Sequence, residues 1–295
     1  MSQEINRRFA ERLKRRDALL MPGAANALAA LVIEDLGFEA VYLSGAGLTN
    51  TLLGLPDLGF VSLPEIAQHT AAIRDCVELP IVVDADTGFG NALNVRHTIR
   101  TLERAGASAV QIEDQVSPKR CGHFSGKDVV STEEMLGKIK AAVDARHDQN
   151  LLILARTDAR ATLGFQAAIH RATAFIEAGA DITFVEAPES LEEISAIPPA
   201  LAAPQLVNMV VGGRTPIIDL AELRGMGFAL VLYANAALQG AVYGMQATLS
   251  QLKDSGRLDE SAPVASFKER QRLVRKPLYD EFEARYAVDP GTTKK

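Results

Sequence analysis

The sequence of 295 residues is 47% hydrophobic and 23% charged, a balance that is typical of globular proteins and excludes an intrinsically disordered chain. Its 31 Lys and Arg and 37 Asp and Glu give a formal net charge of -6, which argues against nucleic acid as a partner, because phosphate backbones attract concentrated Lys and Arg. The two cysteines, Cys76 and Cys121, are too few for a disulfide framework and are typical of a reducing cytosol.

Neither the N-terminus nor the longest uncharged stretch has the pattern of a membrane segment. Residues 1–16 are charged throughout and lack the apolar core of a signal peptide. Residues 225–252 carry no charge, but polar residues such as Asn235 and Gln239 interrupt them, and the apolar spacing is first strand-like and then helical. We therefore expect a buried strand followed by a buried helix, in a soluble cytoplasmic protein with no membrane partner.

Short apolar runs recur along the chain, each followed by a longer amphipathic stretch. Such runs of Val, Ile and Leu without polar alternation indicate strands buried on both faces, as in a parallel sheet. The eight expected strands span residues 18–22, 40–44, 80–84, 109–113, 151–156, 182–186, 205–209 and 229–233. The clearest helical patterns span 25–36, 93–105, 132–145, 165–178 and 190–194. Glycine follows several helices directly before the next strand, as expected for left-handed caps, at Gly37, Gly106, Gly179 and Gly227.

Eight consecutive strand-then-helix units favour a closed (β/α)8 TIM-type barrel, an α/β fold, over an open doubly wound sheet. No linker or shift of composition divides the chain before about residue 255. We therefore expect a barrel with an N-terminal helix over residues 1–255 and a C-terminal helical extension of the same domain over 256–295. Residues 257–286 are charged and helical, and either pack on a neighbouring subunit or form a solvated terminal helix.

Active sites of parallel barrels form where the strands end, because the loops that follow the strands converge there. Polar residues are concentrated at these positions in the sequence. They are Tyr42 and Ser44 after the second strand, Asp84 and Asp86 after the third, Glu113 and then Lys119, Cys121 and His123 after the fourth, Arg156 after the fifth, Glu186 after the sixth and Asn208 after the seventh.

Asp84 and Asp86 are candidate metal ligands. They are two residues apart at a strand end, so their side chains are expected on the same face, where the two carboxylates repel. A hard divalent cation relieves that repulsion, and Glu113 can add a ligand directly or through water. Oxygen ligands without a histidine pair favour Mg²⁺ or Mn²⁺ over zinc. Alternatively, one aspartate caps the following loop and the other pairs with an arginine.

Cys121 and Arg156 are candidate catalytic residues. Cys121 stands near Lys119 and His123, and neighbouring cations favour the thiolate and bring its proton exchange close to neutral pH. The alternative is an ordinary buried cysteine. Arg156 closes a strand of Leu and Ile, where a cation either pairs with Glu186 or Glu113 or binds a substrate carboxylate bidentately.

Four segments together resemble the isocitrate lyase/phosphoenolpyruvate mutase superfamily, with similarity from about residue 22 to 233. The segments are VDADTGFG at 83–90, IEDQ at 112–115, PKRCGH at 118–123 and ARTD at 155–158. The Lys-Arg-Cys-Gly-His element is characteristic of the branch that cleaves carbon–carbon bonds, such as 2-methylisocitrate lyases and 2,3-dimethylmalate lyases.

This resemblance implies a barrel with a swapped C-terminal helix, a homotetramer, and Mg²⁺ held by Asp84 and Asp86 with Glu113 behind it. It implies substrate contacts from Ser44, Gly45, Ala46, Cys121, Gly122, Arg156, Glu186, Asn208 and Arg270. Asp57 matches a family position near the metal. Tyr42 and Asp57 are both candidates for the base that removes the proton from a substrate hydroxyl.

The sequence departs from methylisocitrate lyases at several positions. Gln239 replaces their usual arginine after the eighth strand, Gln111 replaces a common histidine, and residues 209–213 (MVVGG) resemble dimethylmalate lyases instead. A third carboxylate would then lack its cation, and an unpaired buried charge costs several kcal/mol. We therefore expect a 2-alkylmalate rather than a tricarboxylic acid as substrate.

The expected reaction is a Mg²⁺-dependent retro-Claisen cleavage of a 2-hydroxy dicarboxylate to a 2-oxo acid such as pyruvate and a second carboxylate. Arg156, His123 and Asn208 would stabilise the carbanion as charge develops on its carboxylate, and Cys121, tuned by Lys119 and His123, would protonate it. The alternatives are a 2-methylisocitrate lyase, an oxaloacetate or phosphonate enzyme, and a non-catalytic barrel that binds a metabolite.

Overall fold

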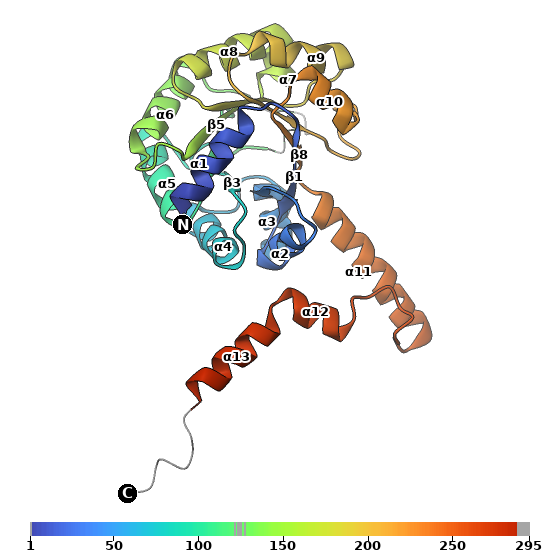
Figure 1. The fold of residues 1–295 in the computed structure, drawn as a ribbon. Coiled ribbons are helices and arrows are strands. Elements are labelled where there is room, and N and C mark those ends of the chain that lie inside the picture. Colours follow the sequence, from blue (N-terminus) through green and yellow to red (C-terminus); the bar gives the residue numbers. More distant parts are fainter. Residues whose placement is uncertain (1, 121, 123–125, 127, 288–295) are drawn as a thin grey trace, which may run out of the picture. The chain divides into compact units, whose positions relative to one another are not determined.

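Eight parallel strands form a closed barrel in the order of the chain (Figure 1). The computed structural model describes residues 2–120, 122, 126 and 128–287. The strands are β1 (Leu19–Ala24), β2 (Val41–Leu43), β3 (Ile81–Asp84), β4 (Ala109–Glu113), β5 (Leu152–Thr157), β6 (Ile182–Val185), β7 (Gln205–Asn208) and β8 (Leu230–Tyr233). Pairing of β1 with β8, in which Leu19 lies opposite Leu230, closes the barrel. The predicted (β/α)8 fold is confirmed, and each strand ends within two residues of its expected position.

Helices follow the strands, as Figure 1 shows. They are α1 (Ser2–Leu13), α2 (Ala27–Asp35), α3 (Gly45–Leu53), α4 (Leu63–Cys76), α5 (Ala92–Arg104), α6 (Thr132–Ala145), α7 (Ala159–Leu163), α8 (Phe165–Glu177), α9 (Leu191–Ala200), α10 (Leu220–Met226), α11 (Ala236–Ser255), α12 (Phe267–Leu273) and α13 (Lys276–Tyr286). Helix α9 extends beyond the predicted 190–194. The glycines that were expected to reverse the chain all have positive φ, for example +99° at Gly106 and +106° at Gly179.

The barrel interior is packed with large apolar side chains and closed at one end. Met21, Leu154 and Phe184 are fully buried inside it. Phe9 and Leu13 of α1 join the same cluster, so α1 covers the end at which the strands begin (Figure 1). The opposite end, where the strands finish, remains for a ligand site, as expected for this fold.

The chain divides into two compact units, Met1–Leu238 and Gln239–Lys295. This division falls within α11, whereas the sequence placed the start of the extension at residue 256. No described helix combines the length and the apolar character needed to cross a bilayer.

The expectation that the helix after the eighth strand is buried is wrong for the described chain. Helix α11 has no buried residue, and the side chains of Val242, Met245, Leu249 and Leu252 are 42%, 54%, 59% and 38% exposed. These residues recur at helical spacing and form an apolar face. Periodicity indicates that such a face needs a cover, but it does not identify the surface that covers it.

Candidate active site

A cavity of about 220 Å³ lies at the carboxyl ends of the strands, a size that suits a small metabolite. Ten of the predicted site residues line it: Tyr42, Ser44, Ala46, Asp57, Asp84, Lys119, Gly122, Arg156, Glu186 and Asn208. The structure adds lining residues that the sequence analysis did not single out as site residues: Phe184, Val210, Val211, Gly212, Gly213, Leu232, Ala234 and Asn235.

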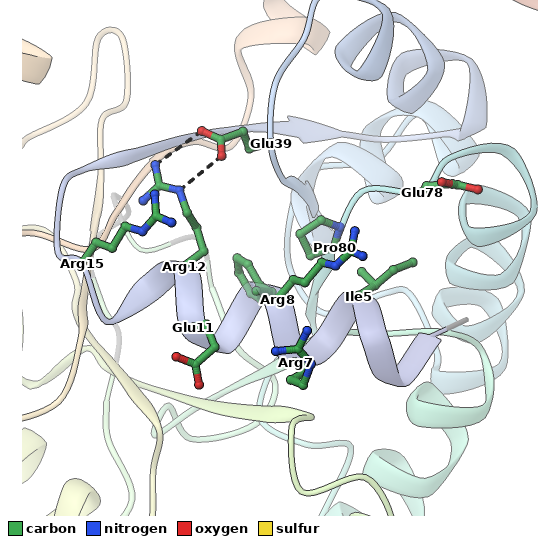
Figure 2. Close-up of a pocket in the computed structure, with 10 residues that line it drawn as sticks. Ile5, Arg7, Arg8, Glu11, Arg12, Arg15, Glu39, Glu78 and Pro80 are labelled. Carbon is green, nitrogen blue, oxygen red and sulfur yellow. Dashed lines mark hydrogen bonds and ion pairs between the residues drawn. The ribbon is translucent and has the colours of Figure 1, made fainter.

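A larger hollow of about 440 Å³ lies beside α1, at the end where the strands begin (Figure 2). Arginines of α1 line it, together with residues such as Glu39 and Pro80 that precede strands. Arg12 pairs with Asp17 and Glu39, and Figure 2 shows its contact with Glu39. The hollow lacks the convergence of strand-end carboxylates found in the smaller cavity, which is therefore the candidate active site.

Asp84 and Asp86 approach the same point beside Gly45. Asp84 Oδ1 accepts hydrogen bonds from Asp86 N and Gln111 Nε2, both at 3.2 Å, and its Oδ2 accepts one from Gly45 N at 3.3 Å. A Cβ at residue 45 would lie 3.1 Å from Asp84 Oδ2 and 3.2 Å from Asp86 Oδ1. Asp86 lies beyond β3 with a φ of +47°, so a left-handed turn, and not strand alternation, brings it here.

Lys119 bridges two of the carboxylates. Its Nζ lies 2.7 Å from Asp57 Oδ1 and 2.9 Å from Asp86 Oδ1, and its side chain is only 6% exposed. Both contacts are short enough for charge-assisted interactions between the ammonium and the carboxylates. Burial raises the pKa of Asp86 to about 7; Lys119 opposes that rise and Asp84 adds to it.

The acidic groups fit a hydrated Mg²⁺ or Mn²⁺ ion. Only oxygen donors are available from Asp84, Asp86 and Glu113, and the buried Glu113 Oε1 accepts no hydrogen bond from the described residues. Within that part of the chain, no three His, Cys, Asp or Glu side chains form a cage for a metal. Mg²⁺ needs no such cage, because it binds through one or two carboxylates and retains several waters.

Arg156 lies among three carboxylates. Its Nε and Nη2 donate to Asp158 Oδ2 and Oδ1 at 2.9 and 3.0 Å, while Nε lies 3.3 Å from Glu113 Oε2 and 3.6 Å from Glu186 Oε2. Burial alone would lower the pKa of Arg156, but Asp158, Glu113 and Glu186 raise it well above its usual value. Pairing with Glu113 or Glu186 was expected from sequence; the closest partner, Asp158, was not.

Gly122 approaches this cluster so closely that only glycine fits. An added Cβ would lie 2.4 Å from Glu186 Oε1 and 2.5 Å from Arg156 Nη2, and both side chains are buried. The predicted residues Cys121 and His123 lie outside the described part of the chain, and their roles remain predictions. Arg270 lies on α12, with its guanidinium carbon 5.4 Å from the Phe267 ring centroid, and its role at the substrate also remains a prediction.

Two asparagines complete the polar part of the cavity. Asn208 ends β7 and Asn235 follows β8, and the buried Oδ1 atom of each accepts no hydrogen bond from the residues described. Asn235 was noted in the sequence only as a polar break in an apolar stretch. Its place directly after a strand was the signal that could have identified it.

Tyr42 faces the cavity as a neutral phenol. Burial, reinforced by the Asp84 carboxylate, raises the pKa of Tyr42 well above its usual value. A phenol in that state donates a hydrogen bond and is a poor base near neutral pH.

Metal-free protein should lose stability as the pH rises through the range in which Asp86 ionises. The folded-state pKa of about 7 exceeds the usual 3.8, so between these values the folded state holds a proton that the unfolded state has released. The contribution of Asp86 to the free energy of unfolding therefore falls over this range, by at most about 1.4 kcal/mol per pH unit. Urea denaturation from pH 4 to 7 measures the effect. Asp86→Asn should lack this component, and equal pH slopes in the two proteins would contradict the prediction.

A methyl group at residue 45 should weaken metal binding, because it would crowd Asp84 Oδ2 and Asp86 Oδ1. We expect Gly45→Ala to bind Mn²⁺ about tenfold more weakly than the wild type, as measured by titration calorimetry. Gly137→Ala on α6 is the matched control, since its added Cβ meets no atom within 4 Å. Unchanged affinity in Gly45→Ala would exclude these two oxygens as the metal site.

Comparison with known proteins places these observations in a family. The sequence model of the phosphoenolpyruvate phosphomutase family matches residues 9–253. The chain is 42% identical to 2,3-dimethylmalate lyase of Eubacterium barkeri, over 94% of this chain and 96% of the relative. It is 47% identical to 2-methylisocitrate lyase of Aeropyrum pernix, over 83% of this chain and 79% of the relative.

Solved structures agree with the sequence relatives. A crystal structure of 2,3-dimethylmalate lyase matches with a TM-score of 0.90 and 32% identity, over 99% of this chain and 98% of the other. Phosphonopyruvate hydrolase in complex with oxalate and Mg²⁺ matches with a TM-score of 0.86 and 30% identity, over 96% and 99% of the two chains. The similarity therefore extends over the whole barrel.

Proposed function

Because the chain belongs to the phosphoenolpyruvate mutase/isocitrate lyase superfamily and is a carbon–carbon lyase, we propose that its substrate is a 2-alkylmalate. Cleavage of such a 2-hydroxy dicarboxylate, for example 2,3-dimethylmalate, gives a 2-oxo acid such as pyruvate and a second carboxylate. The proposal includes Mg²⁺ as cofactor, with Mn²⁺ as a substitute, and the cytoplasmic location expected from the sequence.

The composition of the cavity wall carries this proposal. Lys119 and Arg156 are the cations among the described lining residues, and Lys119 is engaged by Asp57 and Asp86. Val210, Val211, Leu232 and Ala234 supply an apolar wall. Such a cavity accepts one carboxylate at Arg156, a second at a metal and an alkyl group against the valines, but its described lining residues offer a third carboxylate no cation.

Asp84 and Asp86 would hold Mg²⁺, with Glu113 acting through water. When bound, the ion supplies Lewis acidity that stabilises the substrate 2-hydroxyl as an alkoxide. The solved relative that contains Mg²⁺ and oxalate supports this assignment. Because Tyr42 stays protonated, Asp57 is the better candidate for the base that accepts the hydroxyl proton.

In the bond-breaking step, the electrons of the C2–C3 bond move to C3 as the C2 oxygen becomes a carbonyl. Arg156 and Asn208 would donate hydrogen bonds to the carboxylate of the C3 carbanion, together with His123. Cys121 would then deliver a proton to C3. Gly122, which lies against Arg156 and Glu186 in the cavity wall, supports a role for the 119–123 segment at this position.

2-Methylisocitrate cleavage is the second candidate, favoured by the 47% identity to the Aeropyrum pernix enzyme. Turnover of the two substrate classes separates the candidates. Oxaloacetate or phosphonopyruvate activity and ligand binding without turnover are further outcomes of the same panel.

Purified protein with Mg²⁺ should release a 2-oxo acid from 2,3-dimethylmalate or another 2-alkylmalate. We expect kcat/KM at least about tenfold above that for 2-methylisocitrate, because the apolar wall favours an alkyl group. A coupled 2-oxo acid assay measures both, and EDTA should abolish turnover. A preference for the tricarboxylate would reject the substrate assignment.

The Cys121→Ser variant should lose cleavage but retain its affinity for Mn²⁺. Turnover by this variant would reject the thiol as proton donor.

The proposed assembly is a homotetramer in which C-terminal helices are exchanged between subunits. The exposed apolar face of α11, made by Val242, Met245, Leu249 and Leu252, supports it, because contiguous exposed apolar side chains are typical of interaction surfaces.

A charge on this face should break the assembly. Leu249→Asp should give a smaller particle in light scattering after size exclusion, because the carboxylate would be desolvated in the interface. Gln251→Asp places the same charge on the same helix away from the apolar face and should leave the particle unchanged. A monomeric wild type would contradict the proposed assembly.

A further inference from the structure

We infer that Arg171 and Asp114, a buried ion pair that does not line the cavity, are positioning residues for the Arg156 guanidinium. The inference rests on the proposed function only in assigning Arg156 a substrate carboxylate. The positioning itself follows from the contacts that determine which of three carboxylates binds Arg156.

All three guanidinium nitrogens of Arg171 donate hydrogen bonds, each to a different residue. Nε donates to Asp114 Oδ2 at 2.8 Å, Nη2 to the Val130 carbonyl at 2.7 Å, and Nη1 to Thr132 Oγ1 at 3.1 Å. Arg171 is 6% exposed and Asp114 is fully buried. A planar fork bound at each nitrogen has little freedom, so it fixes Asp114 relative to α8 and the start of α6.

Asp114 in turn fixes the backbone that carries Arg156. Its Oδ1 accepts a hydrogen bond from Asp158 N at 2.9 Å, and its Oδ2 accepts one from Thr157 Oγ1 at 2.7 Å. Its own N donates to the Arg156 carbonyl at 3.2 Å. One carboxylate residue therefore contacts three consecutive residues at the end of β5.

Asp158 is the residue that selects the orientation of Arg156. It binds Nε and Nη2 together through two hydrogen bonds, whereas the shortest contacts of Glu113 and Glu186 with Arg156 are ion pairs of 3.3 and 3.6 Å to Nε. Three buried carboxylates around one guanidinium offer competing arrangements. The one in which Asp158 takes two nitrogens is favoured because Asp114 holds the Asp158 backbone in place. Each alternative arrangement would turn a different edge of Arg156 toward the substrate.

Stability alone does not account for the pair. A buried ion pair can often be replaced by apolar residues at little cost, so its burial does not by itself indicate a stabilising role. Arg146 provides the comparison within this chain. It pairs with Asp181 at 2.6 Å and donates to the Leu151 carbonyl at 2.8 Å, but it lies at the opposite ends of the strands.

Arg171→Lys and Arg146→Lys together test the inference. Lysine keeps the charge beside Asp114 but loses the fork, so Arg171→Lys should lower kcat/KM for the 2-alkylmalate by about 10- to 100-fold, as small displacements of a catalytic group do. Its Mn²⁺ affinity should stay within about twofold of the wild type, because Asp84 and Asp86 are untouched. Arg146→Lys should lower the melting temperature and keep kcat/KM. Equal kinetic effects in the two variants, or none in Arg171→Lys, would overturn the inference.

A crystal structure of Arg171→Lys tests the positioning without any assay. The Arg156 guanidinium should leave Asp158 and pair with Glu113 or Glu186, and an intact fork on Asp158 would contradict the inference whatever the substrate. A wild type without lyase activity would instead reject the proposed function and leave this structural test standing. If Arg171→Lys does not fold, the double variant Asp114→Asn with Arg171→Met removes both charges and should show the same displacement.

Discussion

The burial of several carboxylates beside few cations is the constraint on which the site depends. Asp57, Asp84, Asp86, Glu113 and Glu186 are each at least nine-tenths buried, and among the described residues Lys119 and Arg156 are the buried cations beside them. Taking charges out of water costs several kcal/mol per ion unless partners compensate. Each buried cation of the site compensates several carboxylates at once: Lys119 contacts two carboxylates, and Arg156 contacts three. The remaining excess of negative charge is what a divalent cation would neutralise.

The barrel provides the rigidity that this charge arrangement needs. Its interior is packed with residues such as Met21, Leu154 and Phe184, and α1 seals the end where the strands begin. The strand ends are therefore fixed relative to one another, and like charges stay close instead of separating. The Phe184 ring illustrates the connection, since it fills the interior and also lies 5.3 Å from the Arg156 guanidinium carbon.

The sequence was sufficient for the strands and for the residues that directly follow them. An apolar run identifies a strand buried on both faces, and the residue at its end must then face the site, as for Asp84, Arg156 and Asn208. Sequence patterns do not predict a side chain's position where that position depends on a turn or on a partner distant in the sequence. Asp86 reaches the site through a left-handed turn, and Arg156 binds Asp158 because Asp114, from the neighbouring strand, holds it. The cover of α11 was equally inaccessible, because spacing within a helix contains no information about the surface that it meets.

Part of the cavity lining, formed by Val210, Val211, Gly212 and Gly213, is separate in the chain from the charged groups of the site. These residues lie on the segment between β7 and α10, whereas the charged groups lie at the ends of β3 to β6 and on the loops that follow β2 and β4. Substitutions at Val210 and Val211 could therefore change the size of the molecule that the cavity accepts while the charged groups stay in place. The same separation makes this segment the first place to vary when the substrate selectivity of the enzyme is to be changed.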